Sequence, residues 1–287
     1  MINALIVVYR ESFEALLIVG LLYSFLMRQG ASKKAFRALV FGVFGGLLIS
    51  AALATAIHFA ESEFEGQALD LFQFAMVVLA VFLITHMCIW MRVHGRTLKS
   101  ELEQQASKSL QTGKLLSLGT LTAIAVGREG SETVIFLYGL MAESLEAGKA
   151  LPFVGMALAG LFLGILTWYA FQTGFRYFSQ RAYFTFSTIL LFITAGSMTM
   201  SVAGKMIEFD WIGFGREELW DTSWLLSSNS KLGSIMQLIT GYQDRPTVFA
   251  VSLYASYWIV ALSLFYWAGR QVTQQPAKKS KQISTLV

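Results

Sequence analysis

The sequence INALIVVYRESFEALLIVGLLYSFLM, at residues 2–27, is long and apolar enough to cross a bilayer as one helix, yet it carries charges in its middle. These charges are Arg10, Glu11 and Glu14, in the order R-E-x-x-E. A second copy, Arg128-Glu129-Gly130-Ser131-Glu132, lies in another apolar stretch. Ionisable groups are costly at bilayer depth, so they are kept mainly where they bind an ion, line a pathway or pair with each other. The two copies predict a cation pathway through a membrane.

Similar apolar stretches recur along the chain, which is 55% hydrophobic and only 14% charged. We therefore predict an all-α polytopic membrane protein with seven transmembrane helices. The first stretch has no basic region before it and has charges where a signal peptide would be apolar, so it is expected to remain as a crossing. The predicted crossings are at about residues 2–27, 36–60, 68–92, 115–142, 151–174, 183–205 and 247–268.

The charged residues between the crossings alternate in sign. Lys and Arg follow the first, third, fifth and seventh crossings, whereas the segments after the second and fourth are acidic. Because cytoplasmic loops are enriched in Lys and Arg, we predict an outside N-terminus and a cytoplasmic C-terminus. The net charge of +4 then reflects topology and does not indicate a nucleic-acid partner. Cys88 is the only cysteine, which excludes an intrachain disulfide and a cysteine-cluster metal site.

The two R-E-x-x-E motifs belong to a longer repeat. An offset of 118 relates several identical residues: Arg10 and Arg128, Glu11 and Glu129, Glu14 and Glu132, Gly42 and Gly160, Gly46 and Gly164. The repeat units, about 1–92 and 115–205, each hold three crossings, so the second unit must enter the membrane from the opposite side. Such inverted-topology repeats usually bind their substrate near the midplane, between the halves. The paired glycines are expected to allow close helix packing.

The domain organisation follows from this repeat. Residues 1–270 are predicted to form a single seven-helix domain, in which the outer segment 206–246 precedes a seventh helix at 247–268. Residues 271–287 are expected to be a basic cytoplasmic tail, disordered after Pro276.

The two motifs can supply one ion site. Each lies roughly 12–18 Å into an apolar core about 30 Å thick, and the spacing of three and four residues places its charges on one broad helix face. Together they provide four carboxylates and two guanidiniums with a formal charge of −2: Glu11, Glu14, Glu129 and Glu132, with Arg10 and Arg128. Carboxylate oxygens are hard ligands, and ferric iron fits their hardness and charge. The arginines favour the ionised form of the buried carboxylates.

The same residues allow three other interpretations. Purely structural ion pairs are disfavoured, because buried pairs contribute little to stability and each motif has an additional carboxylate. A proton relay, or proton-coupled transport of another divalent or trivalent cation, would use the same glutamates and stays open as an alternative. An enzyme with metal-dependent chemistry is disfavoured, since the sequence has no cluster of aqueous His or Asp ligands and no phosphate-binding motif. A transporter without an organic cofactor is therefore predicted.

The chain also resembles a known family, the oxidase-dependent iron permeases, in which R-E-x-x-E occurs in the first and fourth of seven crossings. The likeness extends to Met87–Met91 (MCIWM), Leu219–Leu226 (LWDTSWLL) and Gly241–Pro246 (GYQDRP), of which the last two resemble the bacterial, EfeU-like branch. The resemblance implies high-affinity import of iron, with ferric iron favoured, across the cytoplasmic (inner) membrane of a bacterium. It implies that the four motif glutamates bind iron, beside the two motif arginines. The yeast form of the motif is R-E-G-L-E, whereas Ser12-Phe13 and Gly130-Ser131 occupy the middle positions here.

Two extramembrane segments could serve the pathway. The first outer loop carries Glu61, Glu63, Glu65 and Asp70, which could collect cations at the entrance or could simply be a solvated acidic loop. The tryptophans of the outer segment 206–246 suit interfacial anchoring or a short helix over the pathway mouth. The family resemblance suggests, as an alternative, docking of an extracytoplasmic iron-delivery or redox protein there. The iron ion and membrane lipid are the other expected partners.

Overall fold

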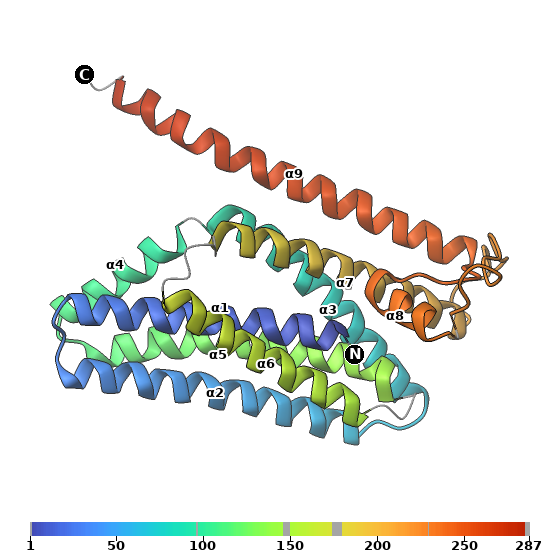
Figure 1. The fold of residues 1–287 in the computed structure, drawn as a ribbon, viewed down its shortest axis with the longest axis horizontal. Coiled ribbons are helices and arrows are strands. Elements are labelled where there is room, and N and C mark those ends of the chain that lie inside the picture. The colour runs from blue at the N-terminus through green and yellow to red at the C-terminus, as the bar shows by residue number, and fades with distance from the viewer. Residues whose placement is uncertain (1, 96, 146–149, 174–179, 229, 285–287) are drawn as a thin grey trace. The chain divides into compact units, whose positions relative to one another are not determined.

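The computed structural model describes residues 2–95, 97–145, 150–173, 180–228 and 230–284. Within these ranges the secondary structure is helical apart from one β-bridge between Glu218 and Thr247, which confirms the all-α prediction for this part of the chain. The helices are α1 (Ile2–Arg28), α2 (Lys33–Ser62), α3 (Gln67–His94), α4 (Leu98–Gln111), α5 (Leu115–Leu145), α6 (Ala150–Gln172), α7 (Gln180–Glu208), α8 (Lys231–Thr240) and α9 (Val248–Ser284) (Figure 1).

Every predicted crossing coincides with a helix: α1, α2, α3, α5, α6, α7 and α9. In the described part of the chain, five of these (α2, α3, α6, α7 and α9) are long and apolar enough to cross a membrane. Helices α1 and α5 fall outside this group because each carries the three charges of an R-E-x-x-E motif. The chain is therefore a multi-pass membrane protein, and the count of seven crossings stays a prediction.

Helix α4 lies between the predicted third and fourth crossings, in a segment for which no helix was predicted. Its few apolar residues are spaced to cover one side of a helix, and Leu102 and Ala106 are buried there. A salt bridge of 2.7 Å joins Glu103 of α4 to Arg28 at the end of α1. The segment was missed because polar residues dominate its composition and hide the helical spacing.

The C-terminal end of α9 also differs from expectation. The helix continues to Ser284, past Pro276, where a disordered tail was predicted. A proline removes only one backbone donor, and residues 271–284 contain no glycine that would favour a helix end.

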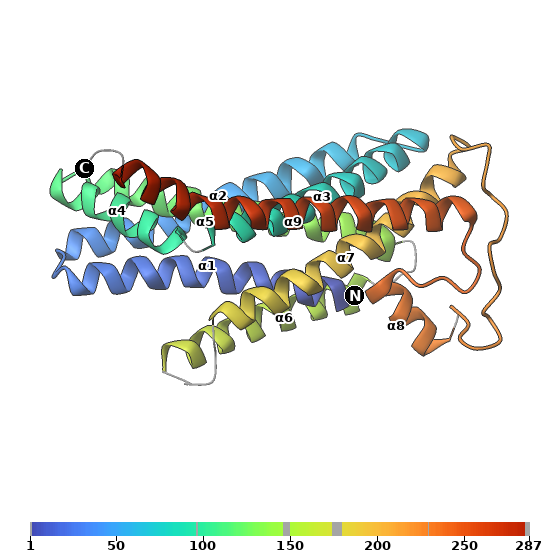
Figure 2. The same cartoon turned by 90° about the horizontal axis from the view of Figure 1, so that it is seen from above.

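The chain divides into two compact units, and the boundaries between them fall inside α3, at the start of α4 and inside α7. Unit 1 comprises Met1–Ala80 and Lys99–Leu190, and unit 2 comprises Val81–Leu98 and Leu191–Val287. In unit 1, α1 packs on α6, α2 packs on α5, and α1 also contacts α5. Figures 1 and 2 show that α1 and α5 run in opposite directions, as do α2 and α6. The offset of 118 relates α1 to α5 and α2 to α6, so exchange of the two repeat units turns the α1–α6 pair into the α5–α2 pair. An inverted repeat requires this arrangement.

The repeated glycines lie at these two helix contacts. A Cβ added to Gly46 of α2 would lie 2.9 Å from the Ala123 carbonyl oxygen, and one added to Gly160 of α6 would lie 2.5 Å from the Leu5 carbonyl oxygen. Leu5 corresponds to Ala123 by the offset of 118, and Gly46 corresponds to Gly164. Leu5, however, contacts Gly160, which corresponds to Gly42. The α1–α6 contact is thus displaced by four residues, about one helical turn, relative to the α2–α5 contact.

Gly160→Ala is expected to destabilise the protein by about 1–3 kcal/mol, because the added methyl group meets a backbone oxygen that cannot rotate away. Unfolding of the purified protein in one detergent measures the effect. Gly155→Ala in the same helix is the matched control, since no atom lies within 4 Å of its added Cβ. Equal losses of stability in the two variants would contradict the close α1–α6 contact.

In unit 2, the outer segment is held together by its own hydrogen bonds. The Leu219 N–H donates to the Pro246 carbonyl at 2.9 Å, and the Thr222 N–H donates to the Asp244 carbonyl at 2.9 Å. The N–H and hydroxyl of Ser228 donate to the Asp244 carboxylate, and these bonds hold the pKa of that carboxyl below its ordinary value. The two stretches that carry the bacterial resemblance are therefore bonded to each other. The segment contains one short helix, α8, which carries none of its tryptophans, so a helix over the pathway mouth stays a prediction.

Candidate metal centre

The first R-E-x-x-E motif lies on the buried side of α1. Arg10, Glu11 and Glu14 expose 2%, 1% and 5% of their surface. Arg10 bonds both acids, with Nη1 at 2.7 Å from Glu11 Oε1 and Nη2 at 2.8 Å from Glu14 Oε1. The planar guanidinium presents several donors in a fixed geometry and is charged at any working pH. Arg10 is thus a permanent counter-charge shared by two buried carboxylates.

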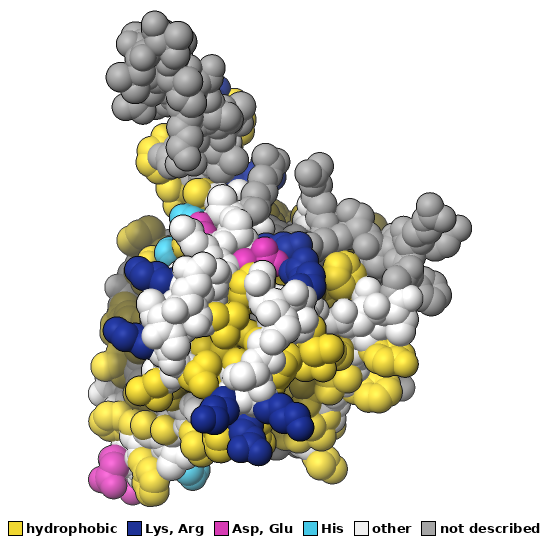
Figure 3. All heavy atoms as spheres, turned by 90° about the vertical axis from the view of Figure 1, so that its left-hand side faces the viewer, with side chains coloured by type: hydrophobic (Ala, Val, Ile, Leu, Met, Phe, Trp, Pro, Cys, Tyr) yellow, Lys and Arg dark blue, Asp and Glu magenta, His cyan; other side chains and the backbone are white. Residues whose placement is uncertain are grey.

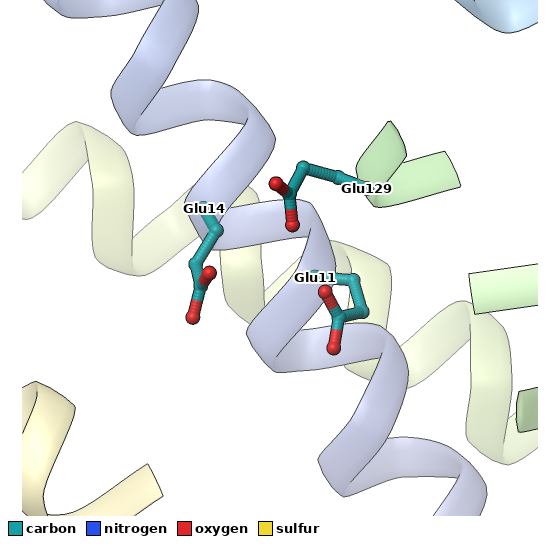
Figure 4. A group of neighbouring side chains, drawn as sticks. All are labelled: Glu11, Glu14 and Glu129. Carbon is teal, nitrogen blue, oxygen red and sulfur yellow. The ribbon is translucent and has the colours of Figure 1, made fainter. Parts of the chain in front are cut away.

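The second motif contributes a third carboxylate to the same place. Glu129 of α5 is 4% exposed, and Figure 4 shows it reaching toward Glu11 and Glu14 on α1. One carboxylate oxygen from each of the three residues lies within 4.8 Å of the others. Oxygen ligands of hard divalent cations lie about 2.0–2.6 Å from the ion, so ligands on opposite sides of one ion are about 4–5 Å apart. The three glutamates can therefore share one cation after small side-chain movements.

Glu132, the fourth predicted ligand, is placed differently. Its Oε1 accepts a hydrogen bond of 2.9 Å from Arg128 Nε, and the two side chains are 17% and 36% exposed. Glu132 is also close enough to Glu11 and Glu14 to interact with them electrostatically. The structure thus brings three of the four glutamates together and leaves Glu132 at the margin, paired with the second motif arginine.

Several carboxylate oxygens at this place have no partner. Among the described residues, Glu11 Oε2, Glu129 Oε2 and Glu132 Oε2 are buried and accept no hydrogen bond. A buried ionised group without a partner is strongly unfavourable. The three clustered carboxylates and Arg10 together carry a formal charge of −2. Unpartnered hard oxygens with an excess of negative charge are the donor set that a metal cation would occupy.

Packing explains why the first motif has Ser12 where the second has Gly130. A Cβ on Gly130 of the second motif would overlap the hydroxyl of Ser50 from α2, whereas Gly164 of α6 would bring its own Cβ within 3.1 Å of Ser12 in the first motif. Each of these two contacts therefore needs one glycine. In the α2–α5 contact the glycine belongs to the motif, and in the α1–α6 contact it belongs to the helix that packs on the motif. Ser50, which also hydrogen-bonds the Gly46 and Gly127 carbonyls, was not singled out from the sequence. The glycine in the second motif was the one signal that could have indicated it.

The acidic residues of the first outer loop are not assembled into a site. Glu61 lies in the last turn of α2, Asp70 lies in the first turn of α3, and Glu63 and Glu65 are exposed between these helices. Within the described ranges, the one group of three or more His, Cys, Asp or Glu side chains that could hold a metal ion is Glu11, Glu14 and Glu129. Attraction of cations by the loop stays a prediction.

Comparisons with known proteins agree with this chemistry. The "Iron permease FTR1 family" matches residues 1–272. A relative named "Ferrous iron permease EfeU" from Yersinia pestis is 29% identical over 287 residues, which cover 97% of this chain and 98% of the relative. The protein of the same name from Escherichia coli O6:H1 is 32% identical over 269 residues, covering 91% and 93% of the two chains. No solved structure matches the chain. The chain is therefore a membrane transporter rather than an enzyme, and it belongs to the iron permease FTR1 family.

Proposed function

We propose that this chain imports iron across the cytoplasmic membrane of a bacterium, and that Glu11, Glu14 and Glu129 bind the ion during transit. Family membership supports iron as the substrate. The observation that carries the site assignment is the meeting of three buried carboxylates from two helices within 4.8 Å. The antiparallel course of α1 and α5 supports an inverted repeat that brings the two motifs together from opposite membrane faces.

The two motifs are proposed to have different roles. Arg10 is buried and bonded to two ligands, so the charge balance around the three clustered glutamates is permanent. The Arg128–Glu132 pair is partly exposed, and exposed ion pairs are worth little, so this pair opens at a small cost. Glu132 is therefore the ligand that exchanges the ion with the pathway, and we call it the exchange ligand. It separates from Arg128, binds the incoming ion, and then transfers that ion to the three buried carboxylates.

The oxidation state of the transported iron rests on two opposing considerations. Ligands that are all carboxylate oxygens suit hard cations, which supports ferric iron. The relatives carry the name ferrous iron permease, and the site's formal charge of −2 equals the charge that a ferrous ion would neutralise. The preference for ferric iron stays a prediction that transport measurements can decide.

Vesicles containing the purified protein are expected to accumulate radiolabelled iron with saturable kinetics, whereas protein-free vesicles accumulate almost none. Ferric citrate in air and ferrous iron held reduced by ascorbate are supplied in parallel, and only the ferric form should enter. Entry of the ferrous form alone would overturn the ferric prediction and leave iron transport intact. Equal transport of manganese or calcium, or proton flux without iron reported by a pH-sensitive dye inside the vesicles, would favour the proton-linked or general cation alternative.

The proposed topology has seven crossings, an outside N-terminus and a cytoplasmic C-terminus, and cysteine labelling tests it. Cys88 is the only cysteine, so Cys88→Ala supplies a cysteine-free background. A membrane-impermeant maleimide should label Glu63→Cys, between α2 and α3, in intact cells. It should label Lys108→Cys, in α4, only after permeabilisation. Labelling of Lys108→Cys in intact cells would exclude the inverted arrangement.

A further inference from the structure

An open hollow of about 460 Å³ lies at the start of α2, lined by Phe36, Arg37, Val40 and Phe41. They form two adjacent pairs four positions apart, 36/37 and 40/41, so they lie along one side of the helix. The ring of Tyr23 from α1 packs edge-on against Phe36, with 5.4 Å between the ring centroids, and supports that wall of the hollow. The hollow is therefore mainly apolar, with one guanidinium at its border.

The hollow continues into the apolar surface of a membrane-spanning helix. Helix α2 is among the helices long and apolar enough to cross a membrane. Its outward side chains remain exposed well beyond the hollow, notably Phe44, Leu47 and Leu48, at 60%, 53% and 70%. A surface of this kind on a spanning helix faces lipid chains, so the hollow lies where the hydrocarbon region meets the charged end of α2.

Three cations at this end of α2 lack a protein counter-charge. Lys33, Lys34 and Arg37 are exposed, and among the described residues none of them has a carboxylate within ion-pair distance. Nearby Arg28, in contrast, is neutralised by Glu103 at 2.7 Å. Figure 3 views the end of unit 1 where α1 ends and α2 begins, and Lys and Arg side chains gather there among hydrophobic ones. Positive charge directly beside an apolar hollow is complementary to an anionic amphiphile.

We propose that this hollow binds an anionic glycerophospholipid. The phosphate lies against Arg37, with Lys33 and Lys34 close by, and an acyl chain lies along Val40 and Phe41. Lipid is the occupant because the apolar side of the hollow is part of a membrane-spanning surface, which a free phosphate would leave uncovered. Under the proposed topology this lipid belongs to the cytoplasmic leaflet, where basic juxtamembrane residues attract anionic headgroups. The binding itself depends on neither the iron site nor the orientation of the chain.

Native mass spectrometry of the full chain, released from micelles with equal amounts of phosphatidylglycerol and phosphatidylcholine, tests the site. We expect preferential retention of one phosphatidylglycerol per chain. The triple variant Lys33→Gln, Lys34→Gln, Arg37→Gln should lose this preference by about tenfold or more, since each basic residue near the surface contributes to attraction of anionic lipid. The matched control is Lys99→Gln, Lys108→Gln, Lys114→Gln, which removes the same charge from exposed positions on and beside α4 and should keep the bound lipid.

Three results would overturn the proposal. They are unchanged retention in the α2 triple variant, equal loss in the control triple, and displacement of the lipid by inorganic phosphate alone. Phe41→Gln, which keeps all three cations, should weaken lipid retention as well. The single variant Arg37→Gln, checked for native size by gel filtration, provides the same test should the triple variant fold poorly.

Discussion

Glu14→Gln is expected to lower the affinity for iron at least about 100-fold and to abolish measurable uptake. Loss of a residue that merely supports a metal ligand typically costs 10–100-fold in affinity, and Glu14 is one of the three clustered ligands. The change also reduces the formal charge of the site from −2 to −1, while Arg10 keeps its bond to Glu11. Equilibrium iron binding to the purified protein and uptake into vesicles measure the two effects.

Two further glutamate variants sharpen this test. Glu63→Gln makes the same chemical change at an exposed position and should bind and carry iron normally. Glu132→Gln should retain most of the affinity, because the three clustered carboxylates remain, but it should slow uptake through loss of the exchange ligand. Wild-type affinity in Glu14→Gln would refute the assignment of the site. Identical profiles for Glu14→Gln and Glu132→Gln would refute the difference in roles.

Arg10→Gln is expected to destabilise the protein by about 3–5 kcal/mol, the usual cost of removing one partner from a buried ion pair. Arg10 is 2% exposed and bonded to two carboxylates, which would be left beside Glu129 without their directly bonded counter-charge. Added iron should restore part of the loss, since a ligand that binds only the folded state stabilises it. Unfolding in detergent, with and without iron, measures both quantities.

Arg128→Gln is the matched control for this variant. Its guanidinium is partly exposed and bonded to Glu132, itself partly exposed, so its loss should cost about 0–1 kcal/mol and be insensitive to iron. Equal destabilisation by the two arginine variants would show that the motifs are equivalent and would remove the basis for assigning them different roles.

Local sequence predicted seven of the nine described helices, and it identified the three glutamates that the structure brings together. Apolar length located seven of the described helices to within a few residues, apart from the C-terminal end of α9, because burial in lipid leaves a long apolar run in the sequence. The charges inside α1 and α5 identified the motifs for the same reason, since they are exceptions to that rule. Helix α4 was missed because polar residues dominate its composition and hide its short apolar face. The continuation of α9 was missed because Pro276 was taken as a helix end.

The sequence by itself determined that two motifs exist, that an offset of 118 relates them, and that their glutamates are the candidate ligands. By that repeat the motifs are equivalent. Only the tertiary structure decided that Arg10 joins two buried ligands while Arg128 holds Glu132 at a partly exposed margin. It also decided that the two glycine contacts differ by four residues. The physical reason is that a repeat specifies only corresponding positions along the chain. The burial of each charged side chain, its ion-pair partner and the packing register depend on contacts between helices that are distant in the sequence. These contacts set the free-energy cost of keeping each charge in the protein.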